Sequence, residues 1–288
     1  MLPAYIADMR TVSPEVHLLG KPQIHWPGVK RYLEHVGGMK WFERVYPLVC
    51  NEDRLTGESV TGPLDVHLDD GEALVEFMGR LCYKSWDVGL NPNVTKVRED
   101  SAEYLANVLS QLHGSVFEHA NYNFAFENVS RVETHEHVRH RVGVAISQES
   151  MRYVRLDDLP IWQPDWALED EALQIHVRDW IHHTERLQEF MAKHFKLDNP
   201  GVPFSEKKAK TSYMRRWSPQ GVATQLGWSA NIRTIRWVLQ QRTEGGAEEE
   251  IRMVMQQMGF IMKEVCPNFF ADFTEDEQGQ WVTNYRKV

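Results

Sequence analysis

Cysteine is scarce in this sequence, and long apolar runs are absent. The 288 residues include Cys50, Cys82 and Cys266, which are far apart and form no Cys-x-x-Cys pair. This usage argues against a disulfide framework or a thiolate zinc site and favours a reducing compartment. No apolar run reaches the roughly 18 residues of a membrane-spanning helix. The first residues have no basic segment followed by an apolar one, so we expect a cytoplasmic protein without a secretory signal.

Basic residues are outnumbered by acidic ones. Lysine and arginine total 32 against 41 aspartates and glutamates, for a formal net charge of −9 at pH 7. Non-specific binding to long nucleic acid needs a basic surface, so we do not expect it. A small anionic ligand needs only a local cluster of cations and remains compatible with this charge. The 42% hydrophobic content is that of a globular chain rather than a disordered one.

Hydrophobic periodicity predicts a helix-rich α+β fold. Tyr122, Phe124 and Phe126 alternate with other residues, which predicts a strand over 121–129. Elsewhere apolar residues recur at helical spacing, and Pro267 ends the last such stretch. The predicted helices span residues 29–46, 71–83, 101–112, 166–194, 229–241 and 248–265.

Three regions of different character follow one another along the chain. Residues 1–70 mix prolines with glycine and charge, and we expect an N-terminal extension packed on the core. Residues 71–273 carry the clear periodic patterns and should form the main, catalytic domain. Residues 274–288 are polar, and we expect a loose C-terminal tail.

Groups that could carry chemistry concentrate between residues 113 and 155. Arg139-His140-Arg141 places two guanidinium groups around an imidazole, and the planar guanidinium matches phosphate oxygens. Ser150 and Arg152 follow, and they share a side if the segment is extended. Together these groups predict a nucleotide-phosphate site. The alternative is a run of surface arginines paired with neighbouring glutamates.

The histidines of the same region also suggest a metal site. His135 and His137 share a side only on a strand, whereas His137 and His140 share one only on a helix. Because no regular element presents all three, we expect no metal. A metal-dependent hydrolase, which chelators would inactivate, is the weaker alternative.

The spacing of these arginines resembles that of a known family. Arg139-His140-Arg141, eight further residues and Ser150-x-Arg152 resemble the signature of the flavin-dependent thymidylate synthases, the ThyX family.

Two further blocks agree with the family in order and spacing. Residues 113–119, His-Gly-Ser-Val-Phe-Glu-His, resemble a family segment that precedes an aromatic-rich strand. The resemblance covers roughly residues 72–273. The block near the C-terminus contains Arg215, Pro219, Asn231, Arg233, Arg242, Ala247, Glu250 and Ile251.

The resemblance implies a reductive methylation. The family transfers a methylene group from methylenetetrahydrofolate to carbon 5 of dUMP, and FAD reduced by NADPH supplies the hydride that completes dTMP. It also implies a mixed central sheet flanked by helical bundles, and a homotetramer whose active sites are assembled between subunits. In such an enzyme the protein binds and orients the substrates and the cofactor, and the cofactor supplies the redox chemistry.

Roles follow from the resemblance position by position. His113, Ser150 and Arg242 correspond to catalytic positions, and we expect Arg139, Arg152 and Arg242 to converge on one cleft. The nucleotide-binding positions are Glu136, Arg139, Gln148, Glu149, Ser150, Met151, Arg152, Arg215 and Arg242. The FAD-binding positions are His113, Ser115, Glu118, Arg139, His140, Arg141, Asn231, Arg233 and Trp237.

Three residues depart from those common in the family: Glu136, Gln148 and Trp237. They lie at positions close to the nucleotide or the flavin. Two alternatives to dTMP synthesis therefore stay open. One is modification of another pyrimidine nucleotide, for example hydroxymethylation, and the other is a nucleotide-binding homologue without catalysis.

Overall fold

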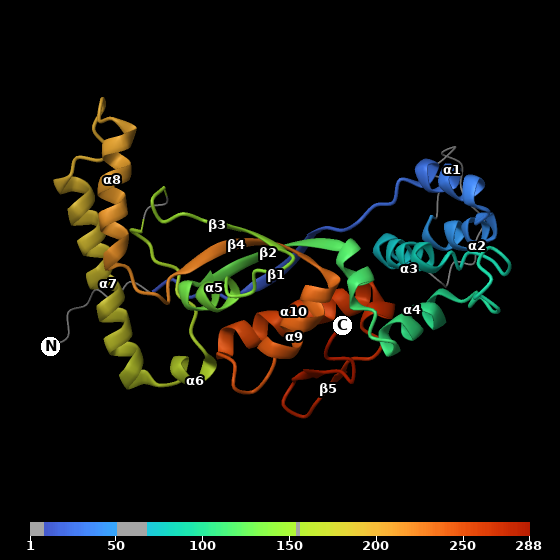
Figure 1. Ribbon diagram of the computed structural model, residues 1–288. Coiled ribbons are helices and arrows are strands. Elements are labelled where there is room, and N and C mark those ends of the chain that lie inside the picture. The colour runs from blue at the N-terminus through green and yellow to red at the C-terminus, as the bar shows by residue number, and fades with distance from the viewer. Residues whose placement is uncertain (1–8, 51–67, 154–155) are drawn as a thin grey trace.

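A four-stranded sheet runs through the middle of the molecule (Figure 1). The computed structural model describes residues 9–50, 68–153 and 156–288. The strands lie in the order β1 (Glu15–Gly20), β2 (Asn121–Ser130), β4 (Ala223–Asn231) and β3 (Val144–Gln148). Each neighbouring pair is antiparallel, and an isolated parallel bridge joins Thr11 to Ile161. The predicted α+β class is confirmed.

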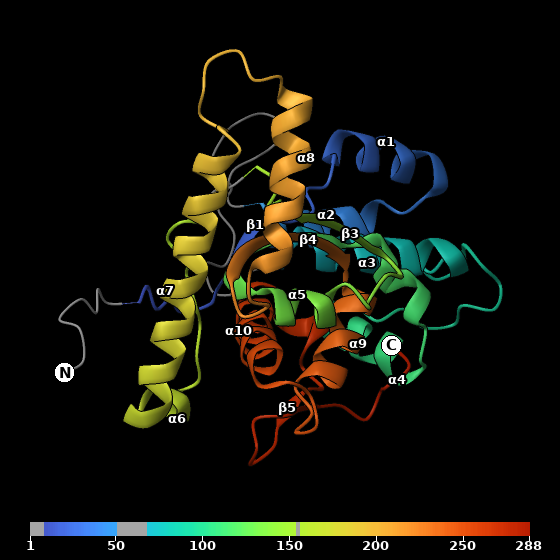
Figure 2. The same cartoon turned by 90° about the vertical axis from the view of Figure 1, so that its left-hand side faces the viewer.

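One face of the sheet is covered by helices. Tyr122, Phe124 and Phe126 point to this face and are buried, which confirms the strand predicted from their alternation. Phe124 lies opposite Trp228 of β4. Helices α9 (Ile232–Arg242) and α10 (Glu249–Val265) pack against this face below the sheet (Figure 2).

The other face carries small or polar side chains, and we call it the open sheet face. One row across the four strands consists of His17, Ala125, Gly227 and Ser147, which are register partners in turn. Of these, His17 and Ser147 are exposed, as is Asn123 in the next row. The sheet is therefore amphipathic, with its aromatic residues on the helix side.

Side-chain caps fix where most of the long helices begin. Asp69 caps α3 in a capping box with Glu72, and Asn231 caps α9 by accepting from the Thr234 N–H. The other helices are α1 (Trp26–Val36), α2 (Met39–Val49), α3 (Asp70–Tyr83), α4 (Ser101–Ser110), α5 (Arg131–His137), α6 (Asp165–Leu168), α7 (Glu171–His194) and α8 (Phe204–Met214), with 3-10 turns at Gly114–His119, Arg215–Trp217 and Pro267–Phe269.

The single helix predicted over 29–46 is wrong, because the chain breaks between α1 and α2. Gly37 adopts a left-handed conformation, with φ of 86°, and ends α1 by donating its N–H to Leu33. The two helices pack with α3 around Trp26, Trp41 and Phe77. Residues 1–8 and 51–67 of the expected N-terminal extension lie outside the described residues.

Three further expectations need correction. The helix predicted from residue 229 begins at Ile232, because Ser229–Asn231 continue β4. The C-terminal tail is ordered rather than loose: β5 (Thr274–Glu275) pairs with β6 (Trp281–Val282), and Trp281 and Val288 are buried. The long stretch at 166–194 divides into α6 and α7.

Helices α7 and α8 stand side by side and project beyond the sheet (Figures 1 and 2). Met191, Leu197 and Met214 form the small core between them. We call this pair of helices the α7–α8 arm.

Among the described residues, no helix combines the length and the apolar character needed to cross a membrane.

Candidate functional site

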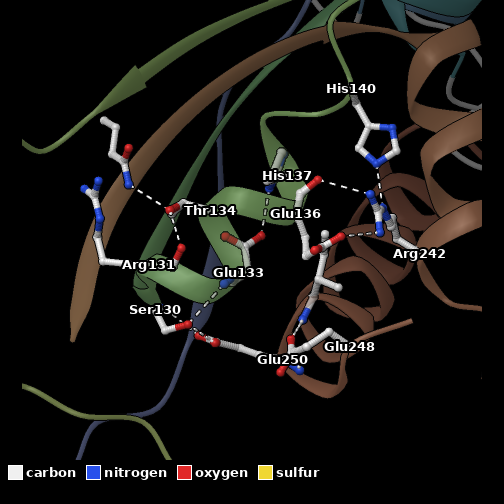
Figure 3. Close-up of polar contacts among 12 residues, drawn as sticks. Ser130, Arg131, Glu133, Thr134, Glu136, His137, His140, Arg242, Glu248 and Glu250 are labelled. Atoms are coloured by element: carbon white, nitrogen blue, oxygen red, sulfur yellow. Dashed lines mark hydrogen bonds and ion pairs between the residues drawn. The ribbon is translucent and has the colours of Figure 1, made fainter. Parts of the chain in front are cut away.

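Helix α5 is anchored in the core by buried polar groups. Ser130 caps it by accepting from the Glu133 N–H, and both oxygens of the Glu250 carboxylate accept from Ser130. Glu133 and His137 are fully buried and pair at 2.8 Å between Oε1 and Nδ1. Burial raises the pKa of Glu250 to about 7, although the Ser130 hydrogen bonds oppose it. This network sets the position of the residues that follow α5 (Figure 3).

Arg242, at the end of α9, reaches across to the far end of α5. Its Nη1 donates to Glu136 Oε2 at 2.8 Å, its Nη2 to the Glu136 carbonyl at 3.2 Å, and its Nε to His140 Nε2 at 2.7 Å (Figure 3). Arg139 lies 3.5 Å from the other Glu136 oxygen. The Glu136 carboxylate is therefore held between two guanidinium groups, and three predicted nucleotide-site residues lie together.

His140 is held as a neutral imidazole. Burial and the neighbouring Arg242 charge lower its pKa to about 4. Because Nε2 accepts from Arg242, the ring proton belongs on Nδ1. That Nδ1 atom is buried and has no partner among the described residues. Because buried donors in proteins nearly always have a partner, this Nδ1–H is a candidate donor to an acceptor atom of a ligand.

His140 also lines a cavity of about 400 Å³ at the start of α9. Arg139, Arg141 and Arg233 border it, so it is cationic in an acidic chain. The exposed Trp237 ring meets the His140 ring edge to face at 5.0 Å. Seven of the nine residues predicted to bind FAD line this cavity, which we call the cationic pocket: Glu118, Arg139, His140, Arg141, Asn231, Arg233 and Trp237.

The other two predicted FAD residues lie next door. His113 and Ser115 line a neighbouring cavity of about 390 Å³, which shares Arg233 with the cationic pocket. Arg233 Nη1 donates to Glu118 at 2.6 Å and so holds the boundary between the two cavities. All the predicted FAD residues thus line one or the other of two adjacent cavities.

The second half of the predicted nucleotide site lies elsewhere. Gln148 donates to Thr134 in the middle of α5, and Glu149 and Met151 line a separate cavity of about 170 Å³. The Arg152 carbonyl accepts from Thr211 of α8. Arg215 is exposed in the turn that follows α8.

Within the described residues of a single chain, Arg152 does not join Arg139 and Arg242, so the expectation that the three share one cleft stays a prediction. Across the described residues, no hydrogen bond, ion pair or pocket lining joins Arg152 to either of the others. Among the described residues, the buried Arg152 Nε atom has no partner, and the one hydrogen bond to Ser150 Oγ comes from the Arg152 N–H, at 3.4 Å.

Sequence reasoning missed several residues of the cationic pocket and its support. Thr234 and Val142 line the pocket, and the Thr234 hydroxyl donates to the Val142 carbonyl. Helical spacing could have found Thr234, because it follows Asn231 by three residues and precedes Trp237 by three. Spacing could also have found the buried Glu133–His137 pair, because residues four apart on a helix lie next to each other.

Two of the three histidines considered as metal ligands, His137 and His140, have protein partners. His137 pairs with Glu133, and His140 accepts from Arg242. In the part of the chain that the structure describes, one cluster has metal-ligand spacing: Glu15, His17 and Glu127, at the surface where β1 pairs with β2.

The comparison with known families decides the relationship. A family model described as thymidylate synthase complementing protein matches residues 64–268. This chain belongs to that family. The resemblance read from its arginine motif is therefore confirmed.

Relatives of this chain are named flavin-dependent thymidylate synthase. That of Mycobacterium avium (strain 104) is 32% identical over 231 residues, which cover 78% of this chain and 88% of the relative. That of Mycobacterium marinum is 33% identical over 216 residues, with coverages of 73% and 83%. A crystal structure of ThyX from Helicobacter pylori with FAD and dUMP is 18% identical, with a TM-score of 0.48, and covers 69% of this chain and 93% of that one.

Proposed function

We propose that this enzyme converts dUMP to dTMP by FAD-dependent reductive methylation in the cytoplasm. Methylenetetrahydrofolate is the carbon donor and NADPH the reductant. The observation that supports this most is the cationic pocket, which gathers seven predicted FAD residues beside the Arg242–Glu136 pair. The relatives named flavin-dependent thymidylate synthase support the reaction, and the residues that line the pocket support a flavin site there.

The cationic pocket fits a flavin dinucleotide. Arg139, Arg141 and Arg233 offer guanidinium donors for a pyrophosphate, and the first turn of α9 adds the positive end of a helix dipole. The partnerless Nδ1–H of His140 supplies a buried donor, and the exposed Trp237 ring supplies an apolar surface for a flat ring. FAD, when bound, supplies the hydride for the reduction.

Ser150, Arg152 and Arg215 fit the phosphate of the nucleotide. Arg152 has a buried Nε without a partner, and a phosphate dianion needs several such donors to offset desolvation. On this assignment Arg242 faces the base end of dUMP. Its guanidinium is already oriented by His140 and Glu136, so little rotamer freedom is lost on binding.

We propose that two copies of the chain complete each active site within a homotetramer. The Arg242 half and the Arg152 half do not meet in one chain, so a partner must supply one of them. The open sheet face offers small side chains for close approach. The α7–α8 arm exposes Trp180, Phe190 and Phe204, and Trp166 and Trp217 are exposed on the segments next to it; exposed aromatic side chains of this kind favour an interface.

Complementation between two inactive variants tests this arrangement. Arg242→Ala and Arg152→Ala should each abolish dTMP formation when assayed alone, the second by weakening dUMP binding ~30-fold or more. After unfolding and refolding as an equal mixture, ~25% of wild-type activity should return if each site uses two chains, because random pairing restores one intact site in each mixed pair. Recovery of none would place both arginines in the same chain's site.

The product identifies the reaction. Wild-type enzyme with dUMP, methylenetetrahydrofolate and NADPH should give dTMP, detected by chromatography and mass. A hydroxymethylated nucleotide, or no product from protein that holds FAD, would contradict the proposed function. The purified protein should be yellow and release flavin on denaturation.

A further inference from the structure

A groove leads away from the cationic pocket toward the segment between α3 and α4. The neighbouring cavity that holds His113 and Ser115 adjoins a third cavity of about 380 Å³. The two share four lining residues, so they are parts of one space, which we call the α3–α4 groove. Its shared residues are Tyr83, Tyr104, Val108 and His113.

The far end of the groove is cationic. The third cavity is lined by Arg80, Lys96 and Arg98 and by no aspartate or glutamate, although the chain carries a net charge of −9. Arg80 is occupied, since it binds Glu76 and the carbonyls of Ser85 and Arg98, and it thereby holds the segment in place.

Lys96 and Arg98 remain available for a ligand. They are two residues apart in the segment between α3 and α4, and both line the same cavity. Lys96 forms no hydrogen bond or ion pair with any described residue, and Arg98 has only Glu103 at 3.6 Å. Both are exposed.

An aromatic pair lies between the two ends. The rings of Tyr83 and His113 are nearly parallel, at 17°, with centroids 6.1 Å apart, and Tyr83 is 53% exposed. A flat aryl group entering the groove would find an aromatic face there. The groove thus presents, in order, the pocket for the reacting rings, an aromatic wall and a pair of cations.

We propose that the α3–α4 groove binds the p-aminobenzoyl-glutamate tail of the folate, and that Lys96 and Arg98 bind its glutamate carboxylates. A reduced folate has a fused ring that carries the one-carbon unit, then an aryl linker, then carboxylates, which is the order of the groups along the groove. Each added glutamate brings one more carboxylate, so the site should favour polyglutamyl folates. This inference rests on the proposed function, since it takes folate as the carbon donor.

The test is a binding measurement that needs no turnover. FAD-loaded full-length protein is titrated with 5-formyltetrahydrofolate, as its monoglutamate and as its triglutamate, and Kd is taken from tryptophan fluorescence. The test variant is Lys96→Gln/Arg98→Gln, which keeps the Arg98 carbonyl that Arg80 uses. The control, Lys30→Gln/Arg31→Gln on α1, removes the same charge away from the groove.

Wild type and control should bind the triglutamate ~10-fold more tightly than the monoglutamate, and the test variant should lose that difference. The FAD content and the dUMP affinity of the test variant should not change. Equal binding of the two folates by wild type would overturn the proposal, as would a loss of FAD from the variant, which would place the flavin's own phosphates in the groove. A rise in the KM for NADPH alone would assign the cations to the reductant's phosphate.

These outcomes are separable from a failure of the proposed function. If wild type prefers the triglutamate and the variant does not, but no dTMP forms, the folate site is supported and the assigned reaction is wrong. If dTMP forms but wild type binds the two folates equally, the reaction is supported and the proposed tail site is wrong.

Discussion

The Nε–H of Arg242 donates to Nε2 of His140 at 2.7 Å, from an arginine 102 residues further along the chain. This one bond selects the neutral imidazole, because a protonated ring would have no acceptor and would face a like charge. It also joins the last turn of α9 to the segment that follows α5. The middle residue of the Arg-His-Arg motif is therefore a neutral donor between two exposed guanidinium groups.

Replacing Arg242 by Met should raise the pKa of His140 from about 4. Burial is the larger cause of the lowered pKa and stays, so the new value should remain below the ordinary 6.5. An NMR titration of the imidazole signals in wild type and variant measures both values. Trp237→Met, which removes a ring neighbour but no charge, is the control. No shift in Arg242→Met would mean that burial alone sets the pKa.

Glu136→Gln should tighten dUMP binding. The carboxylate lies between Arg139 and Arg242, and its negative charge offsets the cations that attract the nucleotide. The amide oxygen can still accept from Arg242, so the geometry is kept while one charge is removed. We expect the KM for dUMP to fall about threefold or more at low salt, less at high salt. Glu136→Asp keeps the charge and is the control; a rise in KM for the Gln variant would mean that the carboxylate binds the base directly.

The halves of this site differed in how far sequence could predict them. Spacing brought out the Arg139-His140-Arg141 cluster, and the family resemblance added Asn231 and the other α9 residues that line the same pocket. The place of Arg152 depends on how β3 leads into the α7–α8 arm, which local spacing does not encode. Spacing alone therefore could not show that Arg152 and Arg242 lie apart within the described residues of one chain.

The fold shows the same division between local and tertiary information. The strand around Phe124 and the helix at α3 follow from periodicity and a capping box. Strand β4 was missed, although Leu226 and Trp228 alternate with smaller residues, because the helical pattern of α9 begins directly after it. Arg236 shows the limit of patterning: it lies on the buried side of α9, where it pairs with Asp272 across 36 residues.

The free energy of unfolding should fall as pH rises from about 4.5 through about 7, because two buried glutamates ionise in this range. Burial raises the pKa of Glu250 and of Glu72 to about 7, above the unfolded 4.5. In this window the folded state binds more protons than the unfolded state, so the stabilisation present below pH 4.5 is lost as the folded groups ionise.

Glu250→Gln removes one of these groups, so its melting temperature should fall less than that of wild type between pH 4.5 and 7. The difference in unfolding free energy across the window should reach at most about 3 kcal/mol. Thermal unfolding at several pH values measures it, with Glu249→Gln, an exposed neighbour on α10, as the control. Parallel pH profiles for wild type and Glu250→Gln would contradict the assignment.

Gly143→Ala should weaken the cationic pocket from outside it. Gly143 has φ of 70°, and a Cβ there would lie 2.3 Å from Asn231 Nδ2 and 2.8 Å from the Thr234 hydroxyl. Asn231 caps α9 and Thr234 bonds the Val142 carbonyl, so the clash would displace the first turn of the helix that lines the pocket. We expect a loss of about 1–3 kcal/mol in stability and a lower FAD content after purification. Gly245→Ala, where a Cβ would meet nothing within 4 Å, should change neither. Full FAD occupancy in a destabilised Gly143→Ala protein would show that the flavin does not use the start of α9.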